Sequence, residues 1–173
     1  SIEHGSLSSA SRDSLREVLS PEESLSLVSA AKIARVTPAV IYQAALALLM
    51  GRYSDQNDVV FGMTLSGRSA PVDGIDSMVG MFINTLPVRV AFSDSESVMS
   101  LLRRLHVEFA SLSEHEHDSV AMISQWAGLT PRQSLFDIAL VIESFPAEAL
   151  SNLDIDVELT SMSTIETTQF PLT

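Results

Sequence analysis

The 173-residue sequence contains no cysteine, few basic residues and few aromatic ones. Without cysteine the chain cannot form disulfides, thiolate nucleophiles or cysteine-ligated zinc sites. Only 10 Lys and Arg oppose 22 Asp and Glu, giving a formal net charge of −12. Nucleic acids and anionic membranes both bind to basic surfaces, so this balance argues against either partner. No segment approaches the ~20 consecutive apolar residues of a membrane span. The composition is compatible with a reducing compartment, and we expect a cytoplasmic location.

The two ends of the sequence predict a piece of a longer protein. Residues 1–5 contain neither an initiator methionine nor the apolar core of a signal peptide. The last residues, 170–173, form no polar tail. An apolar fraction of 46% is nevertheless enough for a real hydrophobic core, so we expect a folded unit.

Three helices are predicted from start signals and apolar spacing. Ser20-Pro21-Glu22-Glu23 forms a capping box with proline at the first helical position, and this helix should run to about Ala34. Thr37-Pro38 starts a second helix with apolar residues on both sides, so we expect it to be buried nearly all round. A third helix is predicted over about 96–112.

Several strands are expected between and after these helices. The continuous apolar run 59–65 predicts a strand covered on both faces, and a long loop follows over 66–77. Residues 82–90 predict a strand in which Pro87 implies an edge position or a bulge. Residues 136–143 predict a largely buried strand, and the alternating run 153–159 predicts one with a solvated face. Alternating helices and strands favour an α/β arrangement.

Two segments invite a chemical interpretation. Residues 62–68 place a Gly-Ser-Gly turn at a strand end, where α/β folds often bind ligands, but match neither a nucleophile elbow nor a phosphate loop. A plain strand-to-loop turn with a surface arginine is the alternative. His115-Glu116-His117-Asp118 suggests a metal site, yet its histidines lie two residues apart and no third ligand is recognisable. We expect a structural helix end or loop there and no metal.

Asn84 lies in a strand that otherwise looks buried, so its amide needs partners for both donor and acceptor. A neighbouring loop would satisfy it as well as a ligand would. No serine–histidine–acid set is recognisable. Composition and spacing alone therefore predict only an acidic α/β domain.

A resemblance to a known family extends this prediction. Residues 79–89, Val-Gly-Met-Phe-Ile-Asn-Thr-Leu-Pro-Val-Arg, closely resemble a signature of nonribosomal peptide synthetase condensation domains. Further matches follow in the family's order and extend the resemblance from about Ser20 to the end of the chain. They are Arg52-Tyr53-Ser54, 58–62, 66–68, His115-Glu116-His117, Leu135-Phe136-Asp137 with Glu143, Glu166-Thr167 and Phe170-Pro171-Leu172.

The resemblance implies an α/β fold, a chloramphenicol-acetyltransferase-like lobe with a mixed sheet and packed helices. Residues 1–173 would be the second lobe of a condensation domain, truncated at its C-terminal end. The family forms an amide bond between a carrier-bound acyl or peptidyl donor and an aminoacyl acceptor. Its HH-x-x-x-DG motif belongs to the first lobe and is missing here, so no residue of this chain is expected to be catalytic. We expect the isolated chain to be inactive.

The implied partners are the missing first lobe, the upstream and downstream carrier domains and an adjacent adenylation domain. The carriers hold 4'-phosphopantetheine, and no cofactor is expected to bind this chain directly. Ser66, Arg68 and Asn84 are the residues we expect to face the substrate tunnel. Two other interpretations stay open: a coenzyme A-dependent acyltransferase of the same fold, and a non-catalytic scaffold lobe.

Overall fold

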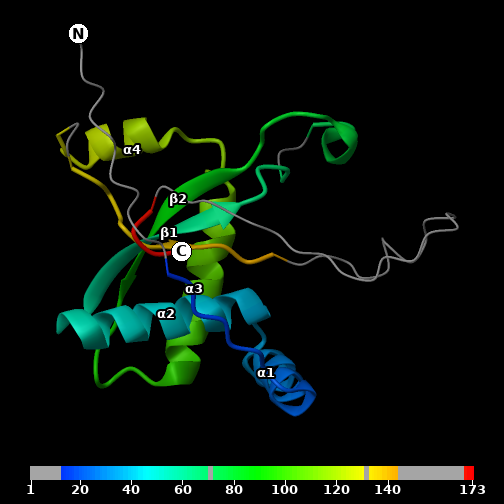
Figure 1. Ribbon diagram of the computed structural model, residues 1–173, viewed down its shortest axis with the longest axis vertical. Coiled ribbons are helices and arrows are strands. Elements are labelled where there is room, and N and C mark those ends of the chain that lie inside the picture. Colours follow the sequence, from blue (N-terminus) through cyan, green and yellow to red (C-terminus); the bar gives the residue numbers. More distant parts are fainter. Residues whose placement is uncertain (1–12, 70–71, 131–132, 144–169) are drawn as a thin grey trace, which may run out of the picture.

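The computed structural model describes residues 13–69, 72–130, 133–143 and 170–173, in which helices pack on a small mixed sheet (Figure 1). The order of elements is α1 (Pro21–Ala34), α2 (Pro38–Ser54), β1 (Asp58–Leu65), the 3-10 helix η1 (Ile75–Ser77), β2 (Asn84–Ala91), α3 (Val98–Ser113), α4 (Val120–Trp126) and β3 (Ala139–Leu140). This mixture of helices and strands confirms the predicted α/β class.

The predicted capping box starts α1. The Ser20 hydroxyl accepts a hydrogen bond from the Glu23 amide at 3.2 Å, and the Glu23 carboxylate accepts one from the Ser20 amide at 2.8 Å. Both amides would otherwise lack partners at the first turn. The helix ends at Ala34, before Arg35 in a left-handed conformation, so both predicted bounds are confirmed.

The expectation that α2 would be buried nearly all round is wrong for the described chain. Its buried face consists of Val40, Gln43, Ala44, Ala47 and Gly51, spaced one to four residues apart. The opposite side is open, and Leu49 is 55% exposed. Among the described elements α2 packs mainly against α3 and β1, which cover only one side of the helix. An apolar sequence pattern shows which faces of a helix could be buried. It does not show which other elements pack against those faces.

The sheet has the order β2-β1-β3 among the described strands, with β1 antiparallel to β2 and parallel to β3. Because β2 is an edge strand among the described ones, Pro87 occupies an edge position, one of the two alternatives that the sequence predicts. Two strand predictions need correction: β2 begins at Asn84 and continues through Ala91, and only Ala139–Leu140 of 136–143 forms a strand. The predicted strand 153–159 lies outside the described residues.

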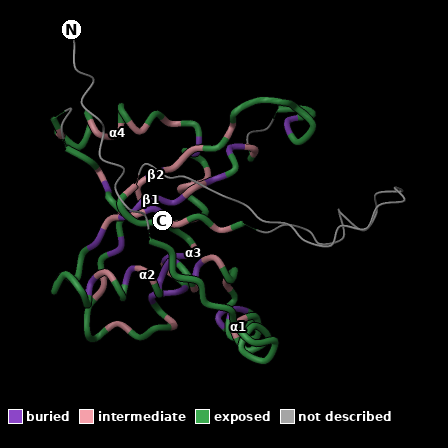
Figure 2. The backbone as a smooth tube through the Cα atoms, viewed as in Figure 1, coloured by how far each residue is buried: buried purple, intermediate pink, exposed green. Residues whose placement is uncertain are grey.

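The main core lies where α2, α3 and the first half of β1 meet, and the buried segments in Figure 2 gather around this junction. Phe61, Val90 and Leu105 are 0–1% exposed there. A second cluster around Met63, Leu65 and Leu86 continues along β1 toward its carboxyl end. It receives residues from α3 and from α4, a short helix that the sequence pattern does not predict. The two clusters together fix the end of β1 from which the next loop leaves.

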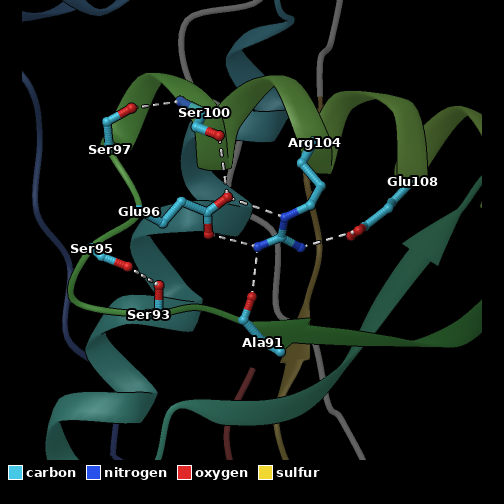
Figure 3. A network of polar contacts seen from close by, with 8 residues as sticks. All are labelled: Ala91, Ser93, Ser95, Glu96, Ser97, Ser100, Arg104 and Glu108. Atoms are coloured by element: carbon cyan, nitrogen blue, oxygen red, sulfur yellow. Dashed lines mark hydrogen bonds and ion pairs between the residues drawn. The ribbon is translucent and has the colours of Figure 1, made fainter.

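Arg104 on α3 anchors the connection between β2 and α3 (Figure 3). Its guanidinium makes an ion pair with Glu96 at 2.9 Å, donates to the Ala91 carbonyl at 2.6 Å and reaches Glu108 at 3.1 Å. The hydrogen bonds from Arg104 hold the pKa of Glu96 below its usual 4.5. This contact orients the start of α3 relative to β2, and thereby the framework of the sheet.

No single described helix has the length and apolar character of a membrane span. The bent pair of α1 and α2 meets that test jointly, by length and composition only, with an angle of 97° between the helices.

Candidate functional site

A groove of about 660 Å³ lies at the carboxyl end of β1. Its walls come from the end of β1, from the segment before β2 and from the residues after β3. The lining residues are Thr64, Leu65, Ser66, Arg68, Val79, Gly80, Met81, Phe82, Ile83, Val141, Ile142 and Glu143. Mostly apolar walls with a few polar groups are typical of small-molecule sites. No histidine is among these described lining residues.

The predicted residues Ser66 and Arg68 both line this groove. Ser66 is exposed, and its hydroxyl accepts a hydrogen bond from the Arg68 amide at 3.4 Å. Between them, Gly67 has a φ of +68°, and a Cβ there would lie 1.7 Å from the Phe82 carbonyl oxygen. The sequence therefore uses glycine where two backbone segments approach closely and where the left-handed region is needed.

The guanidinium of Arg68 is occupied by the protein itself. It donates to the carbonyl of Ile75 and, at 3.1 Å, to that of Met78. Its central carbon lies 4.5 Å from the centre of the Phe82 ring, a cation–π contact. Arg68 thus ties the loop that carries η1 to the segment before β2. Its contacts shape the groove wall, and they are also compatible with the alternative of a strand-to-loop turn with a surface arginine, since Arg68 is partly exposed.

Asn84 does not line the groove, although it is only two residues from Phe82. Its amide nitrogen donates to the carbonyls of Glu116 and Asp118, both at 2.9 Å, and its oxygen accepts from the Thr85 amide at 3.0 Å. These contacts match the alternative in which a neighbouring loop, rather than a ligand, satisfies the amide of Asn84. Asn84 thus holds the turn after α3. Of the three predicted residues, the structure brings Ser66 and Arg68 together in the groove, whereas Asn84 contacts this turn instead.

Glu116 and Ser69 form a contact that the sequence pattern does not predict. Glu116 is only 3% exposed, and its carboxylate accepts hydrogen bonds from the Ser69 amide at 2.6 Å and from the Ser69 hydroxyl at 2.5 Å. A buried carboxylate requires such partners, because losing its hydration is otherwise costly. The sequence draws attention to this segment through His115 and His117, yet those side chains are 64% and 51% exposed.

The segment 115–118 lies in the turn that follows α3, in agreement with the predicted helix end or loop. Within the described ranges, no group of three or more His, Asp or Glu side chains is arranged to hold a metal ion.

Comparison with known proteins identifies the family. The model of the family "Condensation domain" matches residues 6–173. A linear gramicidin synthase of Brevibacillus parabrevis is 37% identical over 155 residues, which are 90% of this chain and 3% of that protein. Chondramide synthase cmdD of Chondromyces crocatus is 37% identical over 154 residues, 89% of this chain and 4% of that protein. The chain belongs to the condensation-domain family, and it spans only a few per cent of the length of these relatives.

Solved structures agree with this assignment. The first condensation domain of the CDA synthetase superposes with a TM-score of 0.62 at 21% identity, covering 72% of this chain and 28% of that one. A holo four-domain nonribosomal peptide synthetase bound to AMP and glycine gives a TM-score of 0.69 at 16% identity, covering 82% of this chain and 11% of that one. At these identities the likeness shows the fold alone, and it confirms the predicted chloramphenicol-acetyltransferase-like class.

Proposed function

We propose that this chain is the second-lobe part of a condensation domain that joins a carrier-bound acyl or peptidyl donor to a carrier-bound aminoacyl acceptor. Membership of the family supports this proposal, and so do the named relatives, which are peptide synthetases. The downstream amine would attack the upstream thioester carbonyl, forming the amide and releasing the donor's pantetheine thiol. The reactants are delivered on 4'-phosphopantetheine arms of partner carrier domains.

The groove at the end of β1 is the observation that carries the proposed role of this chain. Its volume of about 660 Å³ and its mostly apolar lining suit a flexible arm with a small acyl group at its tip. Holding two reactants in fixed orientation makes their encounter effectively unimolecular, which contributes roughly 7–11 kcal/mol in favourable cases. We assign this chain to the wall of the substrate tunnel and to contacts with the first lobe, which would supply the histidine motif.

Reconstitution tests this proposal. The chain is combined with the remaining parts of its condensation domain, and donor-loaded and acceptor-loaded carrier domains are added. Mass spectrometry of the acceptor arm should show dipeptide only in the complete mixture, and the chain alone should give none. A folded complete domain that forms no dipeptide from verified carriers would refute the proposal.

A coenzyme A-dependent reaction is a second candidate because one relative is seen with such a molecule. The starter condensation domain of rhizomide synthetase, in complex with C8-CoA, superposes with a TM-score of 0.53 at 25% identity, covering 60% of this chain and 23% of that one. In both candidate donors the acyl group is a thioester of pantetheine. The pantetheine belongs to a carrier domain in the first candidate and to coenzyme A in the second. Running the reconstitution with acyl-coenzyme A in place of the donor carrier separates them. Product from acyl-coenzyme A alone would favour this second candidate.

A further inference from the structure

We infer that Glu116 is a positioning residue, which through Ser69 fixes the loop 66–69 at the rim of the groove. This inference rests on the proposed function and adds a residue that itself lies outside the groove lining. Glu116 is one of two polar or charged residues among the buried described ones, the other being Gln43 on α2. A buried carboxylate in a turn requires a specific explanation.

The contact joins distant parts of the chain. Ser69 lies four residues after the end of β1, and Glu116 lies three residues after the end of α3. Both hydrogen bonds from Ser69 go to the same carboxylate oxygen, Oε1. Bonds to an ionised acceptor are stronger than neutral ones, and burial from water removes much of the competition. The Glu116–Ser69 contact therefore holds the loop to the helical layer.

The turn that carries Glu116 is itself fixed from the other side. The Asn84 amide holds the carbonyls of Glu116 and Asp118 at the start of β2. Glu116 is thus supported by the sheet at the same time as it binds the loop. This arrangement gives a rigid connection from β2, through the turn, to Ser69.

The loop is held on its other side by Arg68, whose guanidinium binds the carbonyls of Ile75 and Met78 and lies over the Phe82 ring. Ser66 and Arg68 line the groove, whereas Ser69 and Glu116 are not among its lining residues. Loss of the Glu116 carboxylate would leave the Ser69 amide without this acceptor and would allow the loop to shift. Displacements of about 1 Å by residues far from the reacting atoms can lower a rate by as much as about 100-fold.

The test uses the complete condensation domain with Glu116→Ala, Glu116→Gln and Ser69→Ala variants. Glu114→Ala is the matched control, because it removes an exposed carboxylate from the same turn. In steady-state dipeptide formation we expect kcat to fall about 10- to 100-fold for Glu116→Ala, with KM changed by less than about threefold. Glu116→Gln keeps an oxygen for both Ser69 donors, so it should retain activity within about fivefold of the parent.

A structural readout separates positioning from general stability. Amide hydrogen exchange should speed up in the peptide containing 66–69 of Glu116→Ala, while peptides of α2 and the first half of α3 stay protected as in the parent. Ser69→Ala removes only the hydroxyl donor and is the substitute test if Glu116→Ala does not fold. The kcat of the Ser69→Ala variant should fall about three- to tenfold.

In an active parent, a folded Glu116→Ala variant that keeps kcat within about twofold, or that shows unchanged exchange at 66–69, would overturn the inference. Equal losses in Glu116→Ala and Glu114→Ala would also overturn it. An inactive parent would instead refute the proposed function, and this role with it.

Discussion

Substituting Gly67 by alanine should damage both the stability and the groove of the complete domain. Two costs follow from the structure. The backbone at Gly67 has a φ of +68°, a conformation that costs an L-residue with a side chain roughly 1–2 kcal/mol. A Cβ would also lie 1.7 Å from the Phe82 carbonyl oxygen and 2.5 Å from its carbon. Because these are backbone atoms, no side-chain rotation relieves the overlap, and overpacking typically costs about 1–3 kcal/mol.

Gly128 provides the matched control for this prediction. Its φ of +73° imposes the same conformational cost, and a Cβ there would meet no atom within 4 Å. Chemical denaturation should therefore give a loss of about 2–5 kcal/mol for Gly67→Ala and about 1–2 kcal/mol for Gly128→Ala. The difference between the two losses of stability measures the cost of the overlap between a Cβ at residue 67 and the Phe82 backbone. Equal losses in the two variants would refute the idea that Gly67 is needed for this approach.

Two further predictions concern charge and exposed apolar surface. The pKa of Glu96 is lowered by its hydrogen bonds from Arg104, so its contribution to stability is present above about pH 4.5 and is lost as the pH falls through the lower folded-state value. The stability difference between the parent and Glu96→Gln in urea unfolding should thus shrink below pH 4.5, and a difference independent of pH would contradict this. Val79 and Met81 line the groove and are 104% and 96% exposed, so light scattering should show that the isolated chain self-associates. Val79→Ser with Met81→Ser should reduce this association, and a monodisperse parent at high concentration would contradict the prediction.

Local signals in the sequence are sufficient to predict α1, α2, α3 and the strand β1. The capping box at Ser20 and Glu23 involves residues three apart, so its geometry follows from the residue types alone. The continuous apolar run of β1 predicts burial on both faces, and the described chain meets this fully on one face only. Phe61 and Met63, on the same face, are 0% and 3% exposed, whereas Val60 and Thr64 on the other face are of intermediate exposure. The helix α4 escapes prediction because its seven residues have no side-chain cap and no fully buried residue.

Contacts between distant segments are beyond the reach of sequence patterns. Asn84 is recognisable as a buried amide in need of partners, yet its acceptors lie 32 and 34 residues away in a turn. Glu116 stands out in the sequence only as part of a histidine-rich segment, whereas its role comes from Ser69, 47 residues earlier. The family resemblance leads to Ser66 and Arg68, which line the groove, because their segment precedes the signature in the family's fixed order. Their role at a substrate tunnel stays a prediction. The resemblance does not reveal that Arg68 is occupied by backbone carbonyls.

The most direct test of the central claim asks whether a carrier arm reaches the groove at Ser66. The chain has no cysteine of its own, so Ser66→Cys introduces one thiol into this part of the domain. Ser26→Cys, on the surface of α1, is the control. Each variant of the complete domain is mixed with a carrier domain whose pantetheine arm ends in a haloacetyl group, and peptide mass spectrometry measures the thioether formed.

We expect the S66C variant to react at least about tenfold faster than the S26C variant, because a bound arm has a high effective concentration at the groove. Free haloacetyl pantetheine without a carrier should show a smaller preference. Equal rates for the two variants with the loaded carrier would contradict the assignment of this groove to the substrate tunnel.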